Sequence, residues 1–130
     1  MKIKLNVMFT ISSILLFLLG LGLTVMTSTM LGMISLDANP ASIHFAKGVG
    51  GALLGLAVMT WLARNSEPSP ARNALALGLT LVFLLEGVEY VRAALTGSLQ
   101  AIGWLLAGMW ILLFVFMGLA GRFAMSSETS

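Results

Sequence analysis

Long apolar runs, separated by three short polar stretches, dominate the chain. The runs cover about residues 5–27, 43–63, 71–95 and 101–121. Each can cross the hydrocarbon core of a bilayer, which takes about 20 helical residues. Short connections join antiparallel neighbours in helical bundles. The pattern therefore predicts an all-α integral membrane protein, an up-down-up-down four-helix bundle that forms one four-span domain over residues 1–130.

The first connection contains a methionine-rich segment. We expect residues 28–36 either to extend the first helix or to form a short helix at the outer surface, with Met30, Met33 and Ile34 toward lipid. Met26, Met30 and Met33 recur at helical spacing, and thioethers together with His44 suit Cu(I). Methionine more commonly fills gaps in packing, however. We therefore expect neither a metal nor another cofactor.

The composition agrees with a membrane protein. Hydrophobic residues make up 58% of the chain and charged residues 9%, which is unlike a soluble domain. The absence of cysteine excludes disulfides and thiol nucleophiles. A net charge of +2 is small and dispersed, so we expect the lipid bilayer, and not nucleic acid, to be the main partner.

The basic residues predict an orientation. One side of the membrane receives the larger group, which is Lys2, Lys4, Arg64, Arg72 and Arg122. The other side receives Lys47 and Arg92, so the positive-inside rule places both termini in the cytoplasm. Trp61 and Trp104 fit the two aromatic belts, whereas Trp110 lies deeper, where it packs within the bundle or faces lipid. The first run is longer than a signal-peptide core and lacks a cleavage site, so we expect it to be retained.

The third apolar run carries three charged residues, Glu86, Glu89 and Arg92. Such groups are costly in hydrocarbon and commonly mark functional sites. Helical spacing lets Arg92 pair with Glu89, and Lys47 in the second run has a matching depth. Glu86 is left without its own cation, and Tyr90 lies one turn further along the helix.

Two interpretations of this cluster stay open. The first is a buried ion-pair network that locks the second helix to the third. The second is a polar pocket, open to the outside, in which Glu86 or Glu89 binds a cation or carries a proton.

Glycines form a stripe on the second predicted helix. Gly48, Gly51 and Gly55 share a face, together with His44 and Lys47. Small residues let helices approach closely in membranes. We expect this face to pack against another helix of the same chain, with a homodimer seam as the alternative.

Parts of the chain resemble small bacterial four-helix membrane proteins, some of which are grouped with DoxX-like proteins. The similar stretches are Phe45–Ala57 (FAKGVGGALLGLA), Trp61–Asn65 (WLARN) and Ala71–Leu75 (ARNAL). The second helix of those proteins often opens with a basic residue followed by glycines, as at Lys47 and Gly48. The resemblance implies a four-helix bundle in the bacterial cytoplasmic (inner) membrane and implies no particular reaction.

No enzyme signature is present, because the single histidine and the serines lack partners at catalytic spacing. We therefore expect a non-enzymatic accessory or scaffold protein that binds a small ligand or a membrane partner, either another protein or further copies of this chain. The alternative is a small oligomeric transporter or channel-like subunit that moves protons or cations through the Glu/Lys cluster.

Overall fold

All regular secondary structure in the described part of the protein is α-helical. The computed structural model describes residues 4–97 and 101–128. The five helices are α1 (Leu5–Val25), α2 (Thr27–Met33), α3 (Pro40–Ala63), α4 (Pro70–Leu95) and α5 (Ala101–Glu128). All except α2 are long and apolar enough to cross a membrane. The all-α prediction and the four long apolar helices are therefore confirmed.

Local chemistry explains where the long helices begin. The Asn39 side chain accepts a hydrogen bond from the Ser42 backbone N–H, and the Asn39 N–H donates to Ser42 Oγ, each at 3.0 Å. This capping box precedes Pro40, which suits the first position of a helix because it has no N–H to satisfy. Ser69 and Pro70 begin α4 in a similar way. Both helices therefore start slightly earlier than the apolar runs predict, and α5 extends past residue 121 to Glu128.

The methionine-rich segment forms a helix of its own. The backbone leaves the helical conformation at Met26, and α2 follows for seven residues. The Thr27 hydroxyl donates to the Leu23 carbonyl at 2.6 Å, which holds the two helices together across the break. Ser35, with a φ of 61°, then reverses the chain toward α3. The separate short helix is thus the correct alternative.

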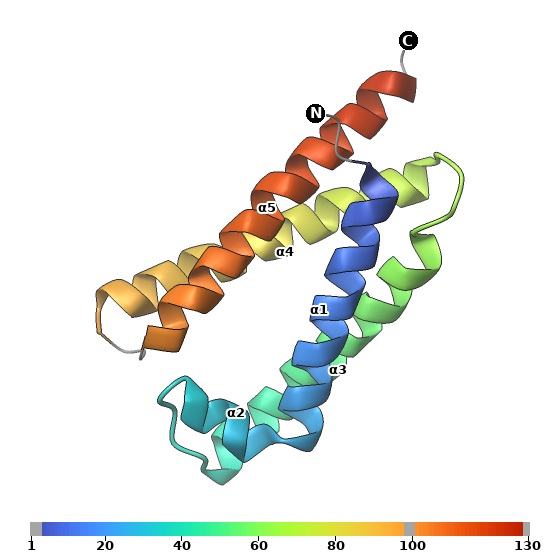
Figure 1. Ribbon diagram of the computed structural model, residues 1–130. Helices are drawn as coiled ribbons and strands as arrows, with labels where there is room; N and C mark the ends of the chain where they lie inside the picture. The colour runs from blue at the N-terminus through green and yellow to red at the C-terminus, as the bar shows by residue number, and fades with distance from the viewer. Residues whose placement is uncertain (1–3, 98–100, 129–130) are drawn as a thin grey trace.

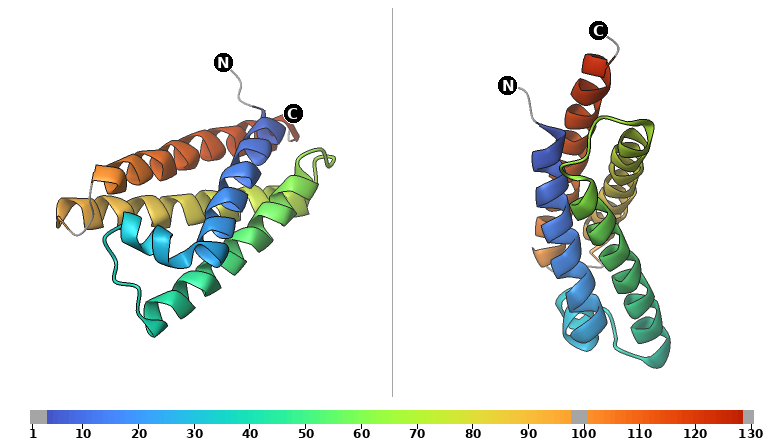
Figure 2. Two further views of the ribbon diagram at one scale, coloured as in Figure 1. Left: turned by 60° about the horizontal axis from the view of Figure 1, so that its bottom comes forward. Right: turned by 90° about the vertical axis from the view of Figure 1, so that its right-hand side faces the viewer.

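The long helices form two antiparallel pairs. α1 packs along α3, and α4 packs along α5, whereas the pairs touch mainly through α1 and α5 (Figures 1 and 2). The pairs come together near the start of α1 and diverge toward the end that carries α2 (Figure 1). α3 and α4 make almost no contact although they are consecutive. The expected packing of the second helix against the third is therefore wrong.

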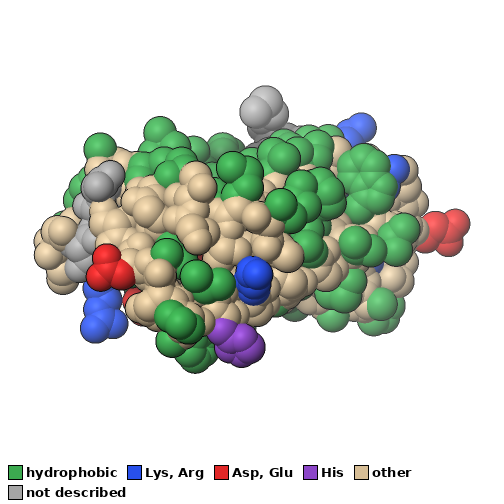
Figure 3. Space-filling model, turned by 90° about the horizontal axis from the view of Figure 1, so that it is seen from below, with side chains coloured by type: hydrophobic (Ala, Val, Ile, Leu, Met, Phe, Trp, Pro, Cys, Tyr) green, Lys and Arg blue, Asp and Glu red, His purple; other side chains and the backbone are tan. Residues whose placement is uncertain are grey.

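The core lies where the two pairs meet. Its largest fully buried side chains come from α1, α4 and α5, and include Phe9, Leu16, Leu79, Phe83 and Met117. Outside this core, hydrophobic side chains cover much of the surface (Figure 3). Phe45, Leu62 and Leu105 each expose more than 70% of their area. Apolar exposure on this scale is unusual in soluble monomers and typical of a surface that meets lipid or a partner.

The glycine packing differs from the prediction. A Cβ atom at Gly48, Gly51 or Gly55 would meet nothing within 4 Å. The close contact instead joins Gly50 to Gly20 on α1, where a Cβ at Gly20 would lie 2.8 Å from the Gly50 carbonyl oxygen. The expected packing of the Gly51/Gly55 face within the chain is therefore wrong, because α3 is rotated by one residue relative to the predicted contact.

Candidate functional site between the helix pairs

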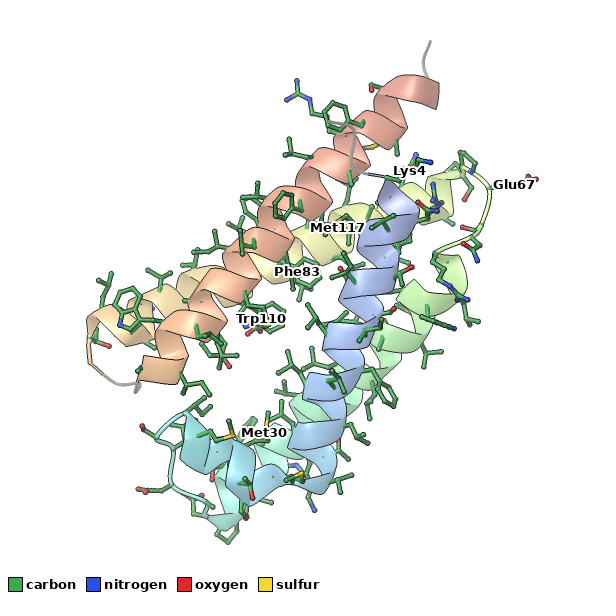
Figure 4. All side chains as sticks on the ribbon, in the orientation of Figure 1. Lys4, Met30, Glu67, Phe83, Trp110 and Met117 are labelled. Carbon is green, nitrogen blue, oxygen red and sulfur yellow. The ribbon has the colours of Figure 1, made fainter. Side chains whose placement is uncertain are left out.

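A cavity of about 190 Å³ lies between the two helix pairs. All five helices line it, since the diverging pairs form its walls and α2 covers one end (Figure 4). Most of the lining side chains are aliphatic or thioether. The lining includes Met30, Met33, Leu53, Glu86, Tyr90, Leu106 and Trp110. The cavity is thus an apolar space with a few polar side chains, which is the usual composition of a small-molecule site.

Glu86 and Tyr90 provide the polar groups from α4. They are one helical turn apart, both are half-buried, and both line the cavity. No hydrogen bond joins them in the described part of the chain, so the carboxyl group and the phenol hydroxyl remain free to bind an occupant. The structure therefore brings together two of the sequence-predicted site residues.

Trp110 on α5 faces these residues. Its ring centroid is 6.4 Å from that of Tyr90 and 5.8 Å from that of Phe83. The residue is only 3% exposed, and its Nε1 is buried without a hydrogen-bond acceptor. An unsatisfied buried donor costs about 1–3 kcal/mol. The indole therefore adds a hydrogen-bond donor to an otherwise apolar wall of the cavity.

The methionines of α2 lie on the cavity side of that helix. Met30, Met33 and Ile34 all line the cavity. Figure 4 shows Met30 directed from α2 toward the space between the pairs. The three side chains thus contribute to the cavity, although Met33 also keeps 44% of its area exposed. The break at Met26 is the reason, because it turns α2 away from the axis of α1 and across the diverging helices.

The remaining charged residues do not join Glu86. Arg92 Nη1 lies 3.7 Å from Glu89 Oε1, and both side chains are largely exposed, at 75% and 68%. The Glu89–Arg92 pairing along the helix is therefore confirmed. Lys47 is exposed and, within the described residues, has no ion-pair partner, so the network between the second and third predicted helices is not formed. Its absence follows from the lack of packing between α3 and α4.

The polar face of α3 points away from the cavity. His44, Lys47, Gly48, Gly51 and Gly55 are all exposed. Among residues 4–97 and 101–128, no group of three or more His, Cys, Asp or Glu side chains could hold a metal ion. The chemistry of the cavity therefore comes from one carboxyl group, one phenol and one indole.

The contribution of α5 and α2 to the cavity was not predicted from the sequence. Trp110 packs within the protein, as one of the two stated alternatives has it, but its position beside Tyr90 was not predicted. A tryptophan in the middle of an apolar run, far from either belt, was the available signal. For α2, the available signal was Thr27, because threonine is more favourable at a helix end than in a helix interior.

Comparison with known proteins gives no match. No family model, curated protein or solved structure matches this chain.

Proposed function

We propose that this chain is a small multi-pass membrane protein that binds a small membrane-soluble ligand in the cavity between its helix pairs, and that its role is accessory and not enzymatic. The observation that carries the proposal is the cavity itself, which all five helices line and which Glu86, Tyr90 and Trp110 provide with polar groups. A space formed by every helix gives its occupant influence over the arrangement of both pairs.

Membrane insertion of α1, α3, α4 and α5 supports this proposal and is part of it. The residues Lys4, Arg64, Arg72 and Arg122 belong to the end where α1 begins, α5 ends and α3 joins α4 (Figure 1). That distribution agrees with a cytoplasmic location of this end. Together with the resemblance described above, it supports the bacterial cytoplasmic membrane as the location, with four spans and both termini inside.

The depth of Glu86 also supports the proposal. α4 has 26 residues, and Glu86 lies about 5 Å past its midpoint at ~1.5 Å per residue. The hydrocarbon core extends about 15 Å on each side of the bilayer centre. A carboxyl group at this depth is expensive to keep and commonly functional.

The orientation is tested with single cysteines, since the chain has none of its own. Ser35 lies between α2 and α3, and Ser66 lies between α3 and α4. A membrane-impermeant thiol reagent applied to intact cells should label Ser35→Cys and spare Ser66→Cys until the membrane is opened. Labelling of Ser66→Cys alone would reverse the orientation.

The ligand proposal is tested by filling the cavity. Leu106 lines it, whereas the neighbouring Leu105 is 71% exposed on the outside of α5. The protein is purified in lipid nanodiscs, and small molecules that accompany it are identified by mass spectrometry. Wild type and Leu105→Trp should retain the same compound, and Leu106→Trp should lose it. Identical profiles for all three proteins would contradict binding in the cavity.

Transport is the second candidate function, and the depth of Glu86 is the observation that favours it. A proton or cation carrier in proteoliposomes should show flux that Glu86→Gln abolishes while the protein stays folded. An accessory protein should show no flux above empty liposomes and should tolerate that substitution without unfolding. Lys47 is exposed and is not among the described residues that line the cavity with Glu86, which removes support from a pathway through a Glu/Lys cluster.

A further inference from the structure

The charge of the cavity discriminates between classes of ligand. Among residues 4–97 and 101–128, Glu86 is the only carboxyl group that lines the cavity, and no lysine, arginine or histidine lines it. The basic residue nearest along α4, Arg92, lies close to Glu89 at the exposed surface. An anionic ligand would therefore meet no positive charge from these lining residues, whereas a cation would supply the partner that an ionised Glu86 lacks.

The aromatic residues point to the same class. Tyr90 and Trp110 line the cavity with ring centroids 6.4 Å apart, and their planes are inclined by 37°. The faces of tryptophan and tyrosine attract cations, and the attraction is strongest where water is excluded. A carboxylate beside two such rings can bind an organic cation from several directions.

The volume sets the size of the ligand. A dry cavity of about 150 Å³ holds a molecule of benzene. The present cavity, at about 190 Å³, has room for one ring with a small substituent. Its remaining walls come from leucine, isoleucine, valine and methionine, so the uncharged part of the ligand is apolar. Met30 and Met33 add adaptable thioether surface at one end.

We propose that the cavity binds an apolar amine or quaternary ammonium compound of about one ring, with its cationic nitrogen held by the Glu86 carboxylate and the faces of Tyr90 and Trp110. This inference rests on the proposed ligand-binding function and names its ligand class. The apolar portion of the molecule packs against Leu53, Leu106 and the methionines of α2.

The test compares two probes of the same shape. Benzylammonium carries the positive charge, and ethylbenzene replaces its ammonium group by a methyl group. Binding is followed by the fluorescence of Trp110 in nanodiscs, in a background where the exposed Trp61 and Trp104 are changed to phenylalanine. Dissociation constants are expressed on the concentration of each probe in the bilayer, so that different partitioning does not enter the comparison.

The matched variants are Glu86→Gln and Glu89→Gln. Glu86 lines the cavity, whereas Glu89 lies on the exposed surface beside Arg92. We expect the charged probe to bind at least about tenfold more tightly than the neutral probe in wild type and in Glu89→Gln. Glu86→Gln should reduce this preference to near unity while it still binds ethylbenzene, which shows that its cavity is intact.

Several results would overturn the inference. Equal affinity of wild type for the two probes would show an apolar cavity without selectivity for cations, and the proposed ligand binding would stand. If Glu86→Gln still preferred the charged probe over the neutral probe, the cation would bind at a site other than Glu86. Failure of wild type to bind benzylammonium would also contradict the inference. The compound retained by wild type but not by Leu106→Trp would decide the proposed function separately.

Discussion

The two helix pairs are held together in different ways. α1 and α3 approach at the backbone, since Gly20 faces Gly50 and no side chain separates the two helices there. A Cβ at Gly50 would lie 2.6 Å from Thr24 Oγ1, and the Thr24 hydroxyl already donates to the Gly20 carbonyl at 2.7 Å. Thr60 likewise donates to the carbonyl of Leu56 in its own helix. These hydroxyl groups are satisfied within their helices.

α4 and α5 pack partly through large side chains and partly through glycines, since a Cβ at Gly87 would lie 3.6 Å from the Ile111 backbone nitrogen. Phe83 from α4 packs against Trp110 from α5, and Met117 is fully buried nearby in the same core. This pair also carries the polar groups of the cavity, which are the Glu86 carboxyl, the Tyr90 hydroxyl and the unpartnered indole N–H of Trp110.

The difference separates structural from functional surfaces. At Gly20 and Gly50 the two backbones meet without a side chain between them, and the Thr24 and Thr60 hydroxyl groups bond within their own helices. A contact built from aromatic residues positions polar tips beside the packed rings. The α1–α3 pair therefore contributes apolar walls to the cavity, and the α4–α5 pair supplies its polar groups.

The largest expected effect comes from the aromatic contact. Phe83 is fully buried, whereas Leu85 on the same helix is 57% exposed. Phe83→Ala should cost about 3 kcal/mol, the low end for a buried phenylalanine, because lipid and not water surrounds the unfolded helices. Leu85→Ala should change stability little, since it removes an outward-facing side chain. The measurement is reversible unfolding in mixed micelles, and equal losses for both variants would contradict the proposed core.

A smaller effect is expected at the glycine contact. Gly50→Ala places a methyl group against Thr24 and the Gly20 backbone, so it should destabilise the protein by about 1–3 kcal/mol. Gly51→Ala meets open space and should leave stability unchanged or slightly raised, because alanine favours helix. The same unfolding assay checks both. Destabilisation by Gly51→Ala but not by Gly50→Ala would restore the packing face that the sequence pattern suggested.

The length and polarity of the helices could be predicted from the sequence. Apolar runs of more than 20 residues leave little choice in secondary structure, because lipid-exposed backbone must satisfy its own hydrogen bonds. The Glu89–Arg92 pair was also predictable, since three residues along one helix bring side chains together whatever the tertiary fold.

Contacts between helices could not be predicted in the same way. Hydropathy changes little around helices whose exposed faces are as apolar as their packed faces, so the rotation of α3 was open. Gly50 and Gly51 are equally small, and only the position of Gly20 on α1 selects Gly50. The order of helices in space was equally open, because a short loop between α3 and α4 allows the two helices to diverge.

The most direct test of the account asks which helix packs against α4. A Cβ at Gly121 would lie 3.6 Å from Ala76 Cβ, which is within the range for a disulfide. In this cysteine-free chain, the double variant Ala76→Cys/Gly121→Cys should form an intramolecular disulfide in the membrane, seen as a mass lower by about 2 Da. Lys47→Cys/Glu89→Cys should remain reduced under the same oxidation. A disulfide between positions 47 and 89, with none between 76 and 121, would contradict the separate helix pairs and the cavity between them.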